Sequence, residues 1–248
     1  MIQWLVQSMA DLAGASEQNP WLNAEEAATY AKLSNPKRRE DWLLGRWTAK
    51  QLVRSALQAQ RGEEWPLARI CIGVEASGAP FVRLDLPGRV AQSSQSFARA
   101  FPEELVNSVS LSISHSAGVA FCALTDQAGC RLGADIEHIE PREMSFVADF
   151  FTAAEMQSVA LAPEPLRASL VTAIWSGKEA VLKAIREGLR SDTRAVECMI
   201  EPLPLPVNQW QPFTIRTDPV REPIFAPLKS WQGWWRSYQG YILTMVVG

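Results

Sequence analysis

Apolar residues in the N-terminal half of the chain follow the spacing of a helix and then that of strands. Between residues 23 and 60 they recur three to four positions apart, which predicts a helix. The recurring positions are Leu43, Leu44, Trp47, Val53 and Leu57. The segment from Ile70 to Leu86 is predicted to form two short strands, because Ser77-Gly78-Ala79-Pro80 supplies a turn between them.

More strands are predicted in the middle of the chain. Residues 109–125 and 130–139 alternate β-branched and small apolar residues with polar ones, as strands do. Because Asp126-Gln127-Ala128-Gly129 offers a turn between these segments, a hairpin is the economical arrangement.

The C-terminal half is predicted to contain a second long helix and further strands. Thr152 and Glu155 fit a capping box, in which each side chain satisfies a free amide of the other residue at a helix start. A helix is then expected from about Leu166 to Glu187. Residues 213–215 and 241–247 are predicted strands, and the tryptophans between them are expected to complete a core.

Two short segments of the predicted helices echo each other. Leu44-Gly45-Arg46 and Leu52-Val53-Arg54 align with Ser176-Gly177-Lys178 and Ala184-Ile185-Arg186 at a constant offset. This echo favours two related α+β halves with one basic helix in each, over residues 1–126 and 127–248.

Composition narrows the class of protein. The chain has 248 residues, 47% of them hydrophobic and 21% charged, as in soluble globular proteins of one or two domains. A net charge of −3 argues against a general nucleic-acid binder. No apolar run approaches the roughly 20 residues of a membrane helix, and the N-terminus lacks a signal-peptide pattern. Four scattered cysteines are expected to be buried thiols in a reducing cytoplasm.

Two carboxylates converge on one predicted strand. Alternation places Asp135 and Glu137 on one face, while Ile136 turns to the other. Such carboxylates repel each other unless a cation lies between them, and hard oxygen ligands favour Mg²⁺. A solvated strand edge is the alternative interpretation.

The second long helix offers groups that would complete this site. Trp175, Glu179 and Lys183 are spaced i, i+4 and i+8, and so lie close to one side of the helix. Glu179 would add a third carboxylate and complete a magnesium site that also takes oxygen ligands from a substrate phosphate. Lys183 would then contact that phosphate. An exposed helix ion pair is the alternative.

The N-terminal half carries candidate phosphate contacts. His115 ends a predicted strand, so it is either a phosphate contact or a buried, hydrogen-bonded histidine. The first predicted helix is basic on its polar side, which is either a solvated face or a phosphate-binding surface. Its basic residues are Lys37, Arg38, Arg39, Arg46, Lys50 and Arg54.

Several motifs match one enzyme family in order and spacing. They are Ser114-His115-Ser116, Gly133-Ala134-Asp135-Ile136-Glu137, Phe150-Phe151-Thr152 with Glu155, and Trp175-Ser176-Gly177-Lys178-Glu179-Ala180 with Lys183. This ordered set, which covers over half the chain from Leu43 onward, resembles the Sfp-type 4′-phosphopantetheinyl transferases.

The resemblance implies a fold, a reaction and a metal. The family fold is a pseudo-dimer of two similar α+β subdomains with the active site in the cleft between them. The reaction moves the 4′-phosphopantetheine group of coenzyme A to a serine of an apo acyl or peptidyl carrier protein and releases 3′,5′-ADP. Asp135, Glu137 and Glu179 would bind Mg²⁺, for which Mn²⁺ is a possible substitute. Glu179 is also the candidate base, and Lys183 would hold the α-phosphate.

The resemblance also implies coenzyme A contacts. Ser114 and His115 resemble the family's phosphate contacts, and Arg46 resembles a basic position near the 3′-phosphate. Lys50, one turn along, is a further candidate from helix geometry. The family often has Gly-Lys-Pro where this chain has Gly78-Ala79-Pro80, so one 3′-phosphate contact is missing, although Gly78 and Pro80 would still shape the adenine pocket.

Two other functions stay open from the sequence. A noncatalytic homologue that binds coenzyme A or a carrier protein is made plausible by Ala79. A metal-dependent phosphohydrolase also uses clustered carboxylates and basic groups. For the transferase we expect a functional monomer in the cytoplasm that binds neither nucleic acid nor membrane.

Overall fold

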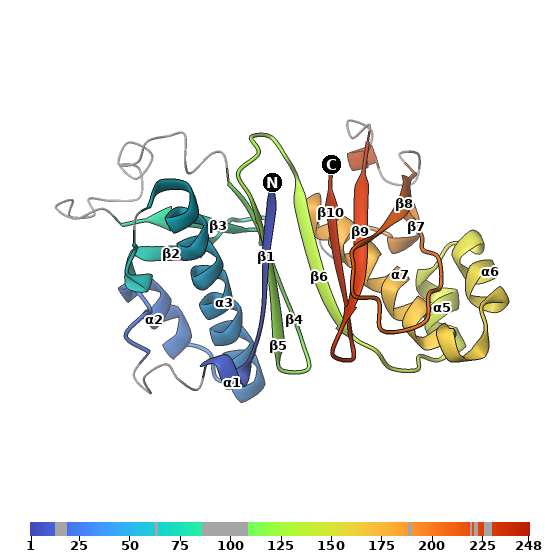
Figure 1. Cartoon of the computed structure of the whole chain (residues 1–248), viewed down its shortest axis with the longest axis horizontal. Coiled ribbons are helices and arrows are strands. Elements are labelled where there is room, and N and C mark those ends of the chain that lie inside the picture. Colours follow the sequence, from blue (N-terminus) through green and yellow to red (C-terminus); the bar gives the residue numbers. More distant parts are fainter. Residues whose placement is uncertain are drawn as a thin grey trace. The chain divides into compact units, whose positions relative to one another are not determined.

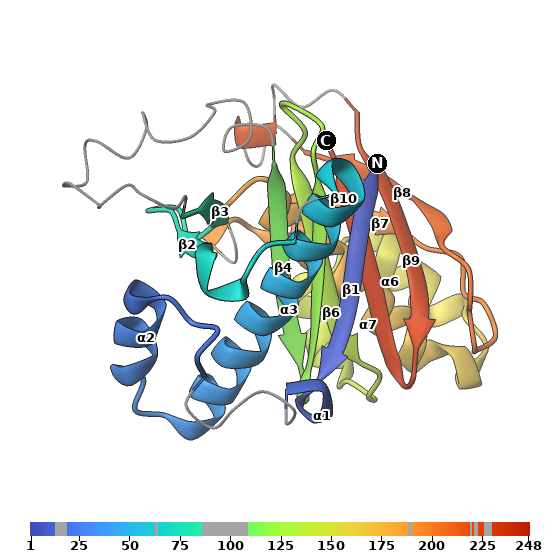
Figure 2. The ribbon, with the colours of Figure 1, turned by 60° about the vertical axis from the view of Figure 1, so that its left-hand side comes forward.

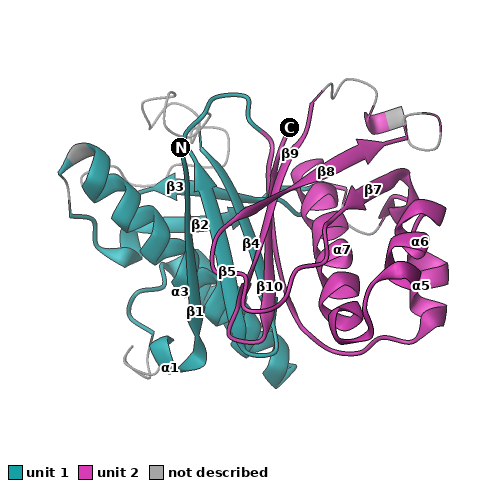
Figure 3. Cartoon of the chain, turned by 45° about the vertical axis from the view of Figure 1, so that its right-hand side comes forward, with its two compact units in different colours: residues 1–130 teal, residues 131–248 magenta. Residues whose placement is uncertain are grey.

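The chain divides into two compact α+β units, Met1–Cys130 (unit 1) and Arg131–Gly248 (unit 2) (Figure 3). The computed structural model describes residues 1–12, 19–62, 64–85, 109–187, 190–218, 220, 223–225 and 230–248. The division lies next to the turn at residues 126–129. The predicted α+β class is confirmed. None of the helices in the described part of the chain is long and apolar enough to cross a membrane.

Unit 1 packs a long helix against an antiparallel sheet (Figure 2). Its elements are β1 (Ile2–Ser8), α1 (Met9–Leu12), α2 (Ala24–Ala31), α3 (Pro36–Arg61), a 3-10 turn (Leu67–Arg69), β2 (Ile70–Val74), β3 (Pro80–Leu84), β4 (Ser110–Ser116) and β5 (Val119–Thr125). The strand order is β1-β5-β4, and the hairpin β2-β3 lies with β3 beside β4.

The single helix predicted over residues 23–60 is two helices. Pro36 begins α3, and the Asn35 side chain caps it by accepting a hydrogen bond from the amide of Arg38 at 2.9 Å. A proline disfavours helical geometry in the residue before it, so the chain breaks there. The helix α3 ends at Gly62, which adopts the left-handed conformation that favours glycine.

Unit 2 packs α5, α6 and α7 with a five-stranded antiparallel sheet of order β6-β10-β9-β8-β7 (Figure 1). Its elements are β6 (Leu132–His138), α5 (Met144–Phe150), α6 (Ala153–Leu161), α7 (Glu164–Ala184), β7 (Val196–Met199), β8 (Gln211–Thr217), β9 (Gln232–Tyr238), β10 (Tyr241–Val247), and 3-10 turns at Thr193–Ala195 and Pro223–Phe225. The helix α7 packs on β6 and β10.

The predicted hairpin across residues 126–129 is wrong. Residues 109–125 break into β4 and β5, which pair with each other, because Ala117 and Gly118 turn the chain with positive φ angles of 43° and 79°. The strand β6 instead pairs with β10, in a register that sets Asp135 opposite Thr244.

The two units repeat one plan. The strands β1, β5, β4, β3 and β2 follow the same order as β6, β10, β9, β8 and β7. Each long helix also carries a fully buried lysine, Lys50 or Lys178, that pairs with the glutamate of a helix-capping box, Glu26 or Glu155. The structural repeat therefore aligns Lys178 with Lys50, one helical turn from the predicted alignment with Arg46.

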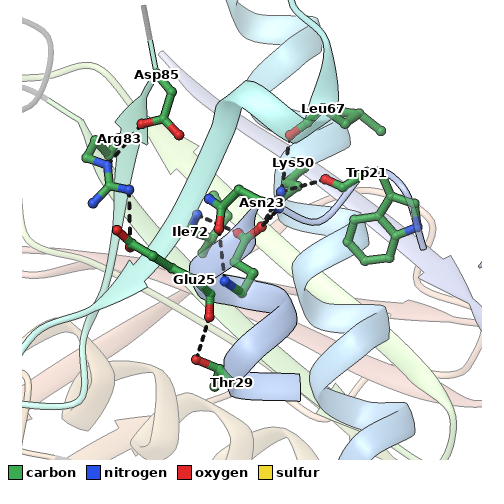
Figure 4. A network of polar contacts seen from close by, with 10 residues as sticks. Trp21, Asn23, Glu25, Thr29, Lys50, Leu67, Ile72, Arg83 and Asp85 are labelled. Atoms are coloured by element: carbon green, nitrogen blue, oxygen red, sulfur yellow. Dashed lines mark hydrogen bonds and ion pairs between the residues drawn. The ribbon is translucent and has the colours of Figure 1, made fainter. Parts of the chain in front are cut away.

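The buried lysine of unit 1 corrects one predicted contact (Figure 4). The Lys50 ammonium donates to the carbonyl oxygens of Trp21 (2.8 Å) and Leu67 (3.1 Å) and to the Glu26 carboxylate. The Glu26 carboxylate also accepts a hydrogen bond from the amide of Ile72 at 2.9 Å. Because three bonds use all the ammonium donors and the side chain is 0% exposed, Lys50 is a structural residue and not a phosphate contact.

Candidate functional site

An acidic cluster forms where β6 lies against α7. Asp135 and Glu137 share one face of β6, while Ile136 is buried on the other. A Cβ atom added at Gly133 would lie 1.8 Å from the carbonyl oxygen of Ala180 on α7. Glycine at this position therefore lets strand and helix approach closely enough to bring the strand carboxylates to the side chains of α7.

Basic and aromatic groups hold the two strand carboxylates. Lys183 Nζ lies 2.6 Å from Oδ1 of Asp135, which is 3% exposed. The indole of Trp175 donates to Oε1 of Glu137 at 3.2 Å, and Arg142 Nη2 lies 3.6 Å from its Oε2. Glu137 is thus fixed from two sides.

The carboxylates interact electrostatically. Burial raises the pKa of Glu179 to about 7, with further repulsion from Asp135 and Glu137 that the Lys183 ammonium partly offsets. Burial, with repulsion from Asp135, also raises the pKa of Glu137, against the opposite effect of Arg142. The structure therefore brings Asp135, Glu137, Glu179 and Lys183 into one cluster.

The chemistry of these three carboxylates suits a hard divalent cation, because they are oxygen donors that repel one another electrostatically. Within the described residues, however, no group of three or more His, Cys, Asp or Glu side chains is arranged to hold a metal ion. The Asp135 carboxylate instead pairs with Lys183.

A cavity of ≈ 660 Å³ in unit 1 gathers predicted coenzyme A contacts. Arg46 on α3, Gly78 and Pro80 at the turn and start of β3, and His115 on β4 all line it. Ser114 does not line it and is 6% exposed, since neighbouring residues of a strand face opposite ways. Other residues that line the cavity are Asn35, Lys37, Arg38, Asp41, Trp42, Gly45, Val74 and Ile113.

The guanidinium of Arg46, a basic group that lines this cavity, is partly desolvated. Burial lowers the pKa of its guanidinium, and its Nε atom is buried without a hydrogen-bond partner among the described residues. The guanidinium carbon lies 4.8 Å from the centre of the Trp42 ring. A partly desolvated cation beside a cavity favours an anionic ligand.

The sequence patterns did not identify several residues of the cavity in unit 1 and of the acidic cluster. Trp42 and Asp41 line the cavity, and Arg142 contacts Glu137, but none was singled out. Trp42 and Asp41 lie one turn before Arg46 and Gly45 on α3, so helical spacing from Arg46 was a signal that pointed to them. No local pattern pointed to Arg142.

Comparison with known proteins finds one family match, which lies within unit 2. Residues 131–245 match the model of the ACPS family, the 4′-phosphopantetheinyl transferase superfamily. The resemblance to 4′-phosphopantetheinyl transferases is confirmed, and the Sfp type stays a prediction. No curated protein sequence matches the chain.

Solved structures of holo-acyl-carrier-protein synthases are similar to about half of the chain. The crystal structure of holo-[acyl-carrier-protein] synthase (AcpS) from Neisseria meningitidis is 16% identical, with a TM-score of 0.38, and the match covers 47% of this chain and 94% of that chain. The Chronobacterium ammoniagenes ACPS-CoA complex is 21% identical, with a TM-score of 0.34, and the match covers 51% of this chain and 96% of that chain. The apo-ACPS structure from the same organism is 20% identical, with a TM-score of 0.36, and the match covers 51% of this chain and 96% of that chain.

Proposed function

We propose that this chain, whose residues 131–245 match the 4′-phosphopantetheinyl transferase superfamily, is an Sfp-type transferase. It would move the 4′-phosphopantetheine group of coenzyme A to a serine of an apo acyl or peptidyl carrier protein. The observation that supports this proposal is the ion pair of Lys183 with Asp135 where β6 packs on α7, together with the electrostatic interaction of Glu137 and Glu179 with Asp135.

In the proposed reaction the serine oxygen attacks the β-phosphorus of coenzyme A. A new P–O bond forms, the bond to the leaving 3′,5′-ADP breaks, and the serine proton passes to Glu179, directly or through a water. Negative charge builds on the phosphate oxygens during the attack. Lys183, which forms an ion pair with Asp135, would stabilise that charge.

Asp135, Glu137 and Glu179 would hold a magnesium ion, for which manganese is a substitute. When bound, the ion supplies positive charge to the pyrophosphate oxygens. Removing divalent cations with EDTA should stop transfer, and added Mg²⁺ should restore it. Transfer that continues at an unchanged rate in EDTA would contradict the metal assignment.

The cavity of unit 1 would take the phosphorylated adenosine end of coenzyme A. Arg46 and His115 would contact its phosphate, and Gly78 and Pro80 would shape the adenine pocket. Ser114 stays a predicted phosphate contact. That one coenzyme A molecule contacts both the cavity and the acidic cluster stays a prediction, as do the monomeric state and the cytoplasmic location.

A noncatalytic homologue that binds coenzyme A or a carrier protein is the second candidate, because Ala79 stands where the family often has a lysine. The protein should be incubated with coenzyme A, Mg²⁺ and an apo carrier protein, and the intact carrier then weighed. A mass gain of one phosphopantetheine group supports the transferase. Binding of coenzyme A without a mass gain supports the homologue, and release of inorganic phosphate without carrier modification supports a phosphohydrolase.

A further inference from the structure

Two consecutive residues of α3 each contact one basic group of the cavity in unit 1. Oδ2 of Asp41 lies 3.7 Å from Nδ1 of His115. The ring of Trp42 lies under the guanidinium of Arg46, with 4.8 Å between the guanidinium carbon and the ring centre. All four side chains line the cavity, so they surround the space that a ligand would enter.

The Trp42 ring is itself held in place. It stacks on Tyr30 of α2, with 5.9 Å between ring centres and an angle of 29° between ring planes. The guanidinium carbon of Arg39 lies 4.5 Å from the centre of the Tyr30 ring. Trp42 also packs against a buried cluster that includes Leu44. A ring fixed in this way restricts where Arg46, one helical turn along, can place its charge.

The contact between Asp41 and His115 depends on the close approach of α3 to β4. A Cβ atom added at Gly45, one turn after Asp41, would lie 3.2 Å from Cγ2 of Ile113. Ile113 and His115 are two residues apart and therefore point to the same face of β4. The Asp41 side chain is 17% exposed and that of His115 is 47% exposed, so the carboxylate is the more buried of the two groups.

We propose that Asp41 and Trp42 are positioning residues, which hold His115 and Arg46 for a phosphate at the adenosine end of coenzyme A. This proposal rests on the proposed function, in which the cavity takes that end. A carboxylate 3.7 Å from Nδ1 attracts that side of the imidazole and so favours one orientation of the ring. Because Ala79 contributes no charge, binding relies on groups that are ordered before the ligand arrives, which lowers the entropy lost on binding.

The charge of Asp41 distinguishes positioning from simple electrostatics. A carboxylate in a cavity that binds phosphate repels the ligand. If charge were its main effect, removing Asp41 would lower the KM for coenzyme A. The proposal requires the opposite, a higher KM, because the imidazole loses its fixed orientation.

The test measures kcat and the KM for coenzyme A in Asp41→Ala, Asp41→Asn, Trp42→Leu and Trp42→Phe. We expect the KM to rise by about fivefold in Asp41→Ala and Trp42→Leu, with kcat and the KM for the carrier protein nearly unchanged. Asparagine keeps the size of the side chain and a polar oxygen, and phenylalanine keeps an aromatic face, so these variants should lie closer to the wild type. Asp126→Ala is a matched control, because Asp126 lies outside the cavity.

A substrate without the 3′-phosphate gives the second readout. With 3′-dephospho-coenzyme A, the variants and the wild type should have the same KM, because Arg46 and His115 then have no phosphate to bind. A fivefold rise with both substrates would overturn the proposal in favour of a general structural role. A lower KM in Asp41→Ala would overturn it in favour of simple charge.

Direct binding keeps this test separate from the proposed function. Calorimetric titration of coenzyme A and 3′-dephospho-coenzyme A needs no carrier protein and no transfer. If the wild type shows no transfer but the variants bind coenzyme A about fivefold more weakly, the proposed function fails and the positioning role stands. Equal affinity of wild type and both truncated variants for coenzyme A would end the positioning proposal.

Discussion

Replacing Lys178 by methionine should destabilise unit 2 by removing one side of a buried ion pair. The Lys178 ammonium is 0% exposed and donates to the carbonyl oxygens of Thr193 (2.9 Å) and Val196. It also lies 2.8 Å from Oε2 of Glu155, which is likewise 0% exposed. Methionine has a similar length and leaves no large cavity, so the change tests the charge and its hydrogen bonds.

The expected loss of free energy depends on the groups that lose a partner when Lys178 is replaced. Breaking a buried pair by removing one partner costs about 3–5 kcal/mol. Glu155 keeps the amide donors of Cys198 and Thr152, both at 2.7 Å, which limits the cost on that side. The two carbonyl groups lose a donor, at about 1 kcal/mol each. We therefore expect a loss of about 3–5 kcal/mol in the free energy of unfolding.

Urea unfolding followed by tryptophan fluorescence measures this loss. Lys50→Met should give a similar loss in unit 1, because its lysine makes the equivalent contacts. Lys32→Met, at an exposed position, should change the free energy by less than about 0.5 kcal/mol. In Lys178→Met with Glu155→Gln the loss should be smaller than the sum of the single losses by about 1–3 kcal/mol. A loss below about 1 kcal/mol in Lys178→Met would refute the reasoning.

Three other predictions concern the acidic cluster and the cysteines. Gly133→Ala should lower the melting temperature and the transfer rate together, because its Cβ would lie 1.8 Å from the backbone of α7, and an unchanged melting curve would contradict this packing. Glu179→Gln and Asp135→Ala should abolish carrier modification with circular dichroism unchanged, and a near wild-type rate in either would remove the assigned roles. A thiol reagent should modify only Cys130 before unfolding, because the other three cysteines are buried and burial raises the pKa of Cys198. Rapid reaction of a second thiol in the folded protein would contradict the burial of these three cysteines.

Local patterns predicted much of unit 2 and of its acidic cluster. Strand alternation placed Asp135 and Glu137 on one face, and the capping box at Thr152 and Glu155 is present with both its hydrogen bonds. These signals work because a strand or helix fixes the direction of neighbouring side chains whatever the rest of the chain does.

Features that depend on distant partners could not be predicted in the same way. Lys50 lies one turn from Arg46 and was expected to bind phosphate, but it is buried because Glu26, on a different helix, meets it. The pairing of β6 with β10 joins segments about a hundred residues apart, so a nearby turn gave the wrong hairpin. The short strand β7 was missed because its four residues carry little periodicity.

The central claim is that the cluster of Asp135, Glu137, Glu179 and Lys183 transfers phosphopantetheine to a carrier serine. The most direct measurement is the amount of 3′,5′-ADP that the protein releases from coenzyme A, followed by chromatography. It is made with an apo carrier protein and with a variant of the same carrier in which alanine replaces the acceptor serine. Wild-type protein should release one 3′,5′-ADP per modified carrier and none with the alanine carrier. Equal release with both carriers, or no release with either, would contradict the account.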